Sequence, residues 1–183
     1  MKIGIVGCGI VGGAIKAYHD GLGDEVWVND IDPTKSQCVD NDAPTDAVFI
    51  CVPTPYLEGA GLDCSRVDLA MATLTGRQTV IIKSTVMPGT TDAMQAKYPQ
   101  HRVFFVPEFL SEASAEWDYR TPRKQHVLGW TGCGFQGIAR DTERLMYKLL
   151  PETKEIDLLY HPMPARQAEQ VRTAIAELTE AGK

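Results

Sequence analysis

Three glycines near the start of the chain are spaced so that a backbone could approach a phosphate closely. Gly7, Gly9 and Gly12 form a Gly-x-Gly-x-x-Gly loop directly after a short apolar segment. In such a loop Gly7 makes the tight turn, Gly9 admits a pyrophosphate, and Gly12 lets the following helix pack closely on the strand. The unpaired N–H groups at the start of that helix, around Ile10 and Val11, would bind phosphate oxygens. The loop therefore predicts a dinucleotide site.

An acidic residue follows at the distance typical of such sites. Asp30 ends the second apolar segment, about 20 residues after the loop, where a carboxylate bonds a ribose 2′-hydroxyl. No arginine stands beside it in the sequence, which favours NAD over NADP because a 2′-phosphate would meet a carboxylate. Asp32 is the alternative acidic residue that could bond the ribose hydroxyl. Lys35 either reaches the cofactor or is a solvated lysine, and both readings stay open.

The elements that must position these residues follow a βαβ pattern. Short, mostly continuous apolar runs alternate with segments of helical period, as in a parallel sheet covered by helices on both faces. The expected strands are residues 2–6, 25–28, 47–52, 79–83, 102–106 and 125–128, and the expected helices are residues 11–19, 67–74, 90–98, 135–149 and 163–180. We predict an α/β fold with a doubly wound, mostly parallel sheet (Rossmann fold) and a C-terminal helix. Residues 1–150 would form the NAD-binding domain and residues 151–183 a C-terminal extension.

Composition excludes several classes of partner. The chain has 183 residues, 44% of them hydrophobic, which fits one globular domain with some chain left over. Its net charge of −6 argues against nucleic acid and anionic membrane surfaces. No apolar run approaches the roughly 18 residues of a membrane span, and no signal peptide is recognisable. The scattered cysteines lack metal-ligand spacing, so we expect a reduced, cytoplasmic protein without a metal site. They are Cys8, Cys38, Cys51, Cys64 and Cys133.

Three further motifs follow expected strands, at the edge where doubly wound sheets bind ligands. They are Cys-Val-Pro-Thr-Pro at 51–55, Lys-Ser-Thr-Val-Met-Pro-Gly-Thr-Thr at 83–91 and Pro-Glu-Phe-Leu-Ser-Glu at 107–112. In this order they resemble the N-terminal domain of the UDP-glucose/GDP-mannose dehydrogenase family, whose enzymes oxidise a primary alcohol of a nucleotide sugar to a carboxylate in two NAD-dependent steps. Asp118 and Pro122 continue the match, which covers about residues 1–150.

The resemblance implies roles for four residues of these motifs. Thr54 would touch the cofactor, and Thr85 would lie near the nicotinamide and help to hold a water molecule. Glu108 would work with Thr85 to position that water, and Glu112 would face the cofactor or the substrate. Structural alternatives remain: a turn hydroxyl for Thr54, a helix N-cap for Thr85, and first-turn helix positions for both glutamates.

The family's remaining catalytic groups do not match this sequence. The family's nucleophile is a cysteine in a Gly-x-Cys-x-x-Lys-Asp motif, and a lysine and an asparagine on a long central helix stabilise the oxyanion. We therefore expect the NAD-binding domain of a UDP-glucose 6-dehydrogenase-like oxidoreductase that lacks the downstream cysteine and the sugar-nucleotide domain. Such a chain would be inactive without a partner that supplies the cysteine and lysine. Cys51, Cys64 and Cys133 are expected in packing or surface positions.

Three functions stay open at this point. The chain is either the NAD-binding part of a dehydrogenase whose other part is a separate polypeptide or a removed part of the same protein, or a catalytically silent NAD(H)-binding or interaction module, or a small reductase that uses Lys83 or a histidine as acid. The expected partners are NAD, a sugar nucleotide, and either a second chain with the missing catalytic domain or a homodimer mate. The sequence leaves the sugar nucleotide and the oligomeric state undetermined.

Overall fold

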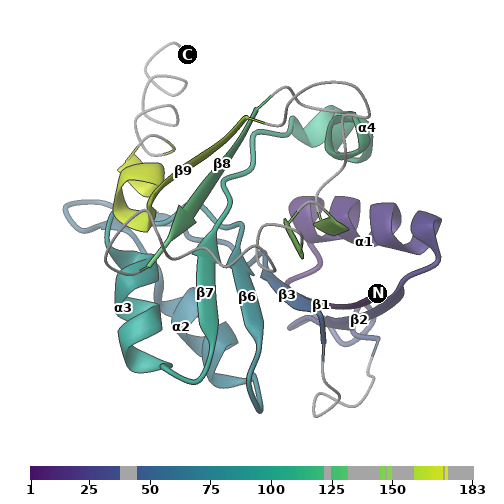
Figure 1. Ribbon diagram of the computed structural model, residues 1–183, viewed down its shortest axis with the longest axis horizontal. Helices are drawn as coiled ribbons and strands as arrows, with labels where there is room; N and C mark the ends of the chain where they lie inside the picture. The colour runs from purple at the N-terminus through teal and green to yellow at the C-terminus, as the bar shows by residue number, and fades with distance from the viewer. Residues whose placement is uncertain are drawn as a thin grey trace.

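Seven strands form the central sheet of the computed structural model, in the order β2-β1-β3-β6-β7-β8-β9 (Figure 1). Residues 1–37, 45–121, 125–131, 145–146, 148–149, 159–170 and 172 are described. Only β7 and β8 pair antiparallel in this sheet, and every other neighbouring pair is parallel. The strands are β1 (Lys2–Val6), β2 (Glu25–Asn29), β3 (Ala47–Ile50), β6 (Thr79–Ile82), β7 (Arg102–Phe105), β8 (Gln125–Trp130) and β9 (Leu159–Pro164). This confirms the predicted α/β fold with a doubly wound sheet.

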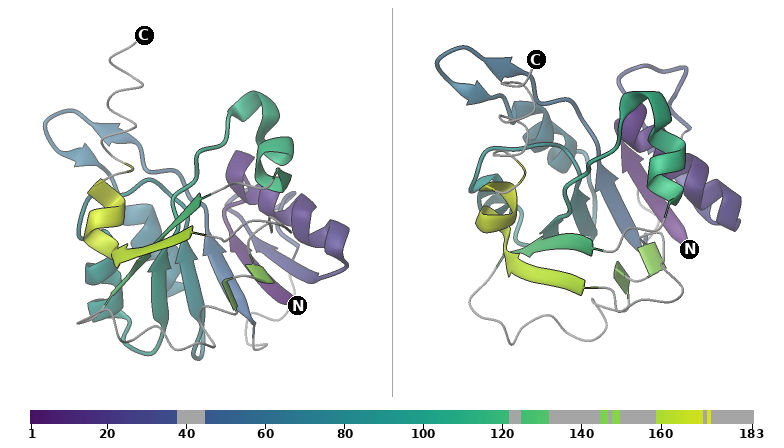
Figure 2. Two further views of the ribbon diagram at one scale, coloured as in Figure 1. Left: turned by 45° about the horizontal axis from the view of Figure 1, so that its top comes forward. Right: turned by 90° about the horizontal axis from the view of Figure 1, so that it is seen from above.

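Helices cover both faces of the sheet (Figures 1 and 2). The helix α1 (Ile10–Leu22) packs with α4 (Ala115–Arg120) on one face, and α2 (Ser65–Ala72) and α3 (Thr90–Lys97) lie on the other. A 3-10 turn, η1 (Glu112–Ser114), precedes α4, and a small hairpin of β4 (Tyr56–Leu57) and β5 (Gly61–Leu62) stands apart from the main sheet.

The strands β1, β3 and β6 send alternate side chains into two separate cores, as a pleated strand must. Ile5 and Phe49 are fully buried beneath α1, whereas Val48 and Ile50 are fully buried beneath α2. Burial on both faces explains why these strands appear in the sequence as continuous apolar runs.

The direction in which successive strands are added to the sheet reverses at β1, and this reversal determines which edge of the sheet can bind a ligand. From β1 the chain continues to β2 on one side, whereas β3 pairs with the other side of β1. The carboxyl ends of β1 and β3 therefore flank a crevice in which doubly wound sheets bind ligands. The glycine loop follows β1 at this crevice, and the motif at 51–55 follows β3.

The glycine loop is held by steric constraints that only glycine satisfies. Gly7 has φ +90, a left-handed conformation that side chains disfavour, and its N–H bonds the carbonyl of Asn29 at 2.8 Å. At Gly12 an added Cβ would lie 2.0 Å from the carbonyl oxygen of Gly7. The predicted tight turn at Gly7 and close packing at Gly12 are thus confirmed.

Several predicted element boundaries differ from the structure. The strands expected at 47–52, 79–83 and 102–106 end one or two residues earlier. The helix expected at 11–19 extends over Ile10–Leu22, with Gly23 as its C-cap. Gly23 has φ +78 and terminates α1 by the usual left-handed cap. The sequence did not predict the hairpin, α4 or β9. Residues 145, 146, 148 and 149 of the helix expected at 135–149 are helical, and the rest of that segment lies outside the described residues.

The predicted start of the C-terminal helix at residue 163 is wrong. Met163 and Pro164 belong to β9, and helical residues are described only at 165–170 and 172. Pro162 and Pro164 argue against a strand at this position in the sequence. In the structure β9 lies at the edge of the sheet, where proline is tolerated because one side of the strand makes no ladder hydrogen bonds. The division between two domains at residue 150 stays a prediction, although β9 continues the same sheet beyond it.

Replacing Gly12 by alanine tests the close approach of α1 to the loop. Because the new Cβ would meet the Gly7 carbonyl, we expect Gly12→Ala to lower the free energy of unfolding by about 3 kcal/mol. Gly13→Ala is the matched control, since a Cβ there meets no atom within 4 Å. Because alanine has a higher helix propensity than glycine, the control should be about 0.5–1 kcal/mol more stable than the wild-type chain. Chemical denaturation measures both, and equal stability of the two variants would contradict the packing account.

Candidate functional site

Two cavities adjoin at the ligand edge, one on each side of the glycine loop. One has a volume of about 670 Å³ and includes Asp30 and Lys35 in its lining, and we call it the Asp30 cavity. The other has a volume of about 430 Å³ and includes Thr85 and Glu108, and we call it the Glu108 cavity. Both are lined by Gly9 and by residues 51–53. A long ligand with two halves could therefore lie across Gly9.

The point between the cavities suits a pyrophosphate. A Cβ added at Gly9 would meet no atom within 4 Å, so the missing side chain leaves open space. No side chain caps the start of α1, and its first turn carries no acidic residue. The N–H groups of Ile10 and Val11, which line the Glu108 cavity, consequently remain available to an anion at the positive end of the helix.

Asp30 is fixed at the edge of its cavity by two backbone donors. Its carboxylate accepts the N–H of Cys8 at 2.5 Å and the N–H of Asp32 at 2.9 Å. The carboxylate of Asp32 instead accepts the N–H and the hydroxyl of Thr34, and Asp32 does not line the cavity. Of the two acids considered from the sequence, Asp30 is therefore the one that faces the cavity, together with Lys35.

Residues of α2 also line the Asp30 cavity, a contribution that the sequence did not suggest. They include Arg66 and Leu69, and Ile31 from the segment after β2 lines the same cavity. The side chains of Ile31 and Leu69 are 102% and 66% exposed, an unfavourable state for large apolar groups that a flat apolar ligand would cover. Nothing local in the sequence marks Arg66, because only the fold brings α2 beside the end of β2.

A buried ion pair dominates the Glu108 cavity. Lys83 Nζ lies 2.9 Å from Glu108 Oε2, and the two side chains are only 2% and 9% exposed. Glu108 Oε1 also accepts the N–H of Phe109 at 2.8 Å. Because removing either partner would leave an uncompensated buried charge, the pair fixes the Glu108 carboxylate in place.

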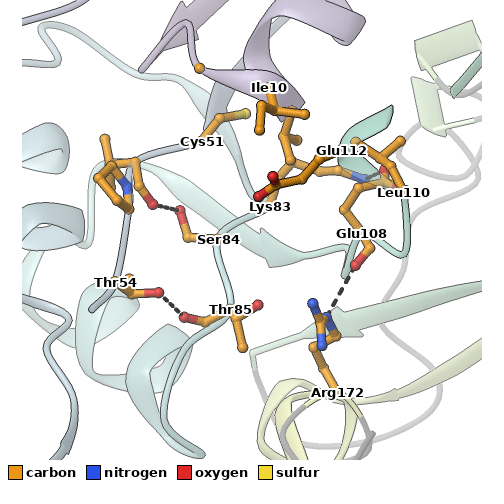
Figure 3. Close-up of a pocket in the computed structure, with 14 residues that line it drawn as sticks. Ile10, Cys51, Thr54, Lys83, Ser84, Thr85, Glu108, Leu110, Glu112 and Arg172 are labelled. Carbon is orange, nitrogen blue, oxygen red and sulfur yellow. Dashed lines mark hydrogen bonds and ion pairs between the residues drawn. The ribbon is translucent and has the colours of Figure 1, made fainter. Parts of the chain in front are cut away.

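Two threonines connect the loops that follow β3 and β6 (Figure 3). The Thr54 hydroxyl donates to the carbonyl of Thr85 at 2.5 Å, and the neighbouring Ser84 hydroxyl donates to the carbonyl of Val52 at 2.7 Å. Thr85 is not the N-cap of α3, since Gly89 occupies that position. The structural alternative considered for Thr85 is therefore wrong, and its side chain belongs to the cavity lining. Glu112 also lines the cavity and is exposed at the start of η1.

Two residues of the C-terminal helical segment were missed by sequence reasoning, one that lines the Glu108 cavity and one that bonds the end of the motif at 83–91. Arg172 lines the Glu108 cavity, donates from Nε to the carbonyl of Glu108 at 3.1 Å, and lies 5.5 Å from the centre of the Phe109 ring (Figure 3). Burial lowers the pKa of Arg172, and the Glu108 carboxylate opposes that shift.

The second missed residue, Glu169, anchors the same helical segment. Its fully buried carboxylate accepts the N–H groups of Gly89 and Thr91 at 2.6 and 2.8 Å and the Thr91 hydroxyl at 2.5 Å. It therefore caps α3 from a distant part of the chain. Burial raises the pKa of Glu169, while these hydrogen bonds lower it.

Cys51 and His101 have structural surroundings. Burial raises the pKa of Cys51 to about 12, with Lys83 opposing the shift, so its thiol is protonated at neutral pH. His101 accepts the N–H of Gln78 at 3.2 Å and lines neither cavity. His126 lies in β8, as predicted. Cys38 and Cys133 fall outside the described residues.

Comparison with protein families settles the relationship. The NAD binding domain of the UDP-glucose/GDP-mannose dehydrogenase family matches residues 36–132, just over half of the chain. The chain belongs to this family. It is the family's NAD-binding domain, which agrees with the open space beside Gly9 and confirms NAD as the cofactor.

The relatives match this chain over about half of their own length or less. UDP-glucose 6-dehydrogenase of Campylobacter jejuni is 27% identical over 207 residues, covering 94% of this chain and 51% of that protein. GDP-mannose 6-dehydrogenase of Pseudomonas aeruginosa is 32% identical over 95 residues, covering 43% of this chain and 22% of that protein. The structure of a UDP-glucose dehydrogenase from Pyrobaculum islandicum superposes with a TM-score of 0.76 at 24% identity, covering 95% of this chain and 48% of that one. At this identity the superposition establishes the fold.

In the part of the chain that the structure describes, no helix combines the length and apolar character needed to span a bilayer. The cytoplasmic location inferred from the cysteines stays a prediction.

Gly9→Val tests whether the opening between the cavities receives the pyrophosphate. Because a side chain there meets open space, we expect the free energy of unfolding to change by less than about 1 kcal/mol. We expect NAD affinity, measured by calorimetry, to fall at least about a hundredfold. Gly13→Ala, on the same helix but outside both linings, should retain NAD binding. Unchanged affinity in Gly9→Val would move the pyrophosphate elsewhere.

The raised pKa of Cys51 predicts a pH-dependent reactivity. Only the thiolate is alkylated, so at neutral pH iodoacetamide should modify Cys51 roughly 1,000 times more slowly than free cysteine. Between pH 7 and 9 the rate should rise about tenfold per pH unit, because that range lies below the pKa of about 12. Mass spectrometry of the peptide containing Cys51 follows the reaction. Rapid modification at neutral pH would identify Cys51 as a reactive nucleophile and contradict the structural role.

Proposed function

We propose that this chain provides the NAD-binding part of the active site of an oxidoreductase that oxidises a nucleotide sugar, with UDP-glucose as the first substrate to test. The observation that carries the proposal is the Lys83–Glu108 pair, buried in a cavity that also contains Thr85 and adjoins the Asp30 cavity at Gly9. A domain that only binds NAD has no need of a buried charge pair beside the second cavity, because burying two charges is costly.

The residues around Gly9 would hold the cofactor in an extended arrangement. Asp30 accepts ribose hydroxyls, and Lys35 lies within the same cavity. The glycine loop and the N–H groups of Ile10 and Val11 take the pyrophosphate. Thr54, Thr85 and Glu112 border the nicotinamide half in the Glu108 cavity. When bound, NAD supplies the hydride acceptor for the oxidation of an alcohol carbon.

Thr85 and Glu108 would do their chemistry as a pair. A carboxylate with its charge balanced by Lys83 is fixed in orientation, and carboxylate oxygens are hydrogen-bond acceptors suited to a water molecule. The Thr85 hydroxyl, from the neighbouring loop, supplies a second contact to that water. Arg172 holds the backbone of Glu108 and keeps this loop in position.

The second oxidation needs a nucleophile from outside the residues that line this cavity. Cys51, the cysteine in the lining, is protonated because burial raises its pKa to about 12. We therefore infer that the cysteine, the lysine and the sugar-nucleotide site come from protein outside these 183 residues, such as a second chain that carries the missing catalytic domain. The alternative is a catalytically silent NAD(H)-binding module, which would bind NAD and give no NADH with any partner.

A complementation assay separates these functions. We mix the chain with NAD, UDP-glucose and the C-terminal half of the Campylobacter jejuni UDP-glucose 6-dehydrogenase, and follow NADH by absorbance. We expect NADH in the mixture, none from the chain alone, and a loss of at least about a hundredfold in kcat for Glu108→Gln.

Glu116→Gln is the matched control, because Glu116 is exposed on α4 and lines neither cavity. An unchanged kcat in Glu108→Gln would contradict the role of Glu108. Absence of NADH in every mixture, with NAD binding intact, would favour the silent module. NADH from the isolated chain would instead show that one of its own residues replaces the missing groups.

A further inference from the structure

The charges of the Asp30 cavity do not match the preference for NAD that Asp30 alone implies. Asp30 is the single carboxylate among the described residues of its lining, whereas Lys35 and Arg66 both contribute positive charge. Lys35 comes from the segment after β2, and Arg66 comes from the first turn of α2. The charged side chains of the lining therefore sum to one positive charge.

Both cations are available to a ligand. Within the described ranges, neither Lys35 nor Arg66 forms an ion pair or a side-chain hydrogen bond. Each has an aspartate nearby, Asp32 for Lys35 and Asp63 for Arg66. Those carboxylates are fixed by the backbone N–H groups of Thr34 and Ser65, at 2.9 Å in both cases, and lie outside the lining.

Asp30, in contrast, cannot turn away from the cavity. The N–H groups of Cys8 and Asp32 hold its two oxygens, so its negative charge stays at the edge where the ribose would lie. A 2′-hydroxyl can donate to this carboxylate, but a 2′-phosphate would be repelled by it at close range.

We propose that Lys35 and Arg66 form a latent site for the 2′-phosphate of NADP, and that the Asp30 carboxylate alone keeps this site closed. The apolar side chains of Ile31 and Leu69 would contact the adenine in both cofactors and therefore do not discriminate between them. Cofactor choice in this chain depends on the fixed negative charge of Asp30 and on the opposing positive charges of Lys35 and Arg66. This inference rests on the proposed position of the adenosine in the Asp30 cavity.

Calorimetric titrations with NAD and NADP test the proposal on the intact chain. The wild-type chain should bind NAD at least about tenfold more tightly than NADP. Asp30→Asn removes the charge while the amide oxygen can still accept one of the two N–H groups, and it should tighten NADP binding at least about tenfold. Adding Arg66→Gln or Lys35→Gln to that variant should remove most of the gain.

Arg77→Gln provides the matched control, since Arg77 is exposed just beyond α2 and lines neither cavity. Combined with Asp30→Asn, it should leave the gain intact. Binding of NADP to Asp30→Asn should also weaken with salt more steeply than binding of NAD, because the added contacts are between exposed charges.

Each outcome decides a separate question. If the wild-type chain fails to bind NAD, the proposed function itself fails. If it binds NAD but Asp30→Asn gains no affinity for NADP, the latent site is refuted and the proposed function survives. A gain that persists in both double variants would show that Lys35 and Arg66 are not its source. Should Asp30→Asn not fold, Asp30→Ala removes the same charge, and equal NADP affinity of Asp30→Ala with and without Arg66→Gln would overturn the proposal.

Discussion

The contact between Gly12 and the carbonyl of Gly7 determines the geometry of the whole ligand edge. It brings the start of α1 against the end of β1, so that the helix begins at Ile10 with its first N–H groups between the two cavities. Asp30 reinforces the arrangement from β2 by bonding the N–H of Cys8 within the loop. An anion-binding helix terminus is common in proteins. Here its position follows from the close approach of Gly12 to the carbonyl of Gly7, which only glycine permits.

The second half of the site depends on charge rather than on close packing. Lys83 and Glu108 follow two neighbouring parallel strands and meet because those strands end at the same edge. The C-terminal helical segment then holds both loops: Glu169 bonds Gly89 and Thr91 at the end of the motif at 83–91, and Arg172 bonds the carbonyl of Glu108. These contacts make the C-terminal segment part of the site, although it lies far along the chain from the glycine loop.

Local patterns in the sequence predicted the parts of the structure that depend on neighbouring residues. The glycine loop, Asp30 and the motifs after β3, β6 and β7 could be found because turn geometry and strand periodicity are properties of short segments. Arg66, Glu169 and Arg172 could not, because their positions depend on contacts between residues far apart in the sequence. The edge strand β9 was missed for a related reason: its prolines are excluded from a central strand and acceptable only at an edge, and the sequence alone does not say which strand is last. The roles of Thr54, Thr85, Glu108 and Glu112 toward the cofactor remain proposals.

The central claim is that the cofactor lies across Gly9, with one half in each cavity. Backbone nitrogen–proton correlation spectra, recorded during a titration with NAD, test it most directly because every assigned amide reports separately. The account predicts saturable shifts at Gly9 and Ile10 between the cavities, at Asp30 in one cavity and at Thr85 in the other. Shifts confined to one cavity, or an absence of shifts at Gly9 while NAD binds, would contradict it.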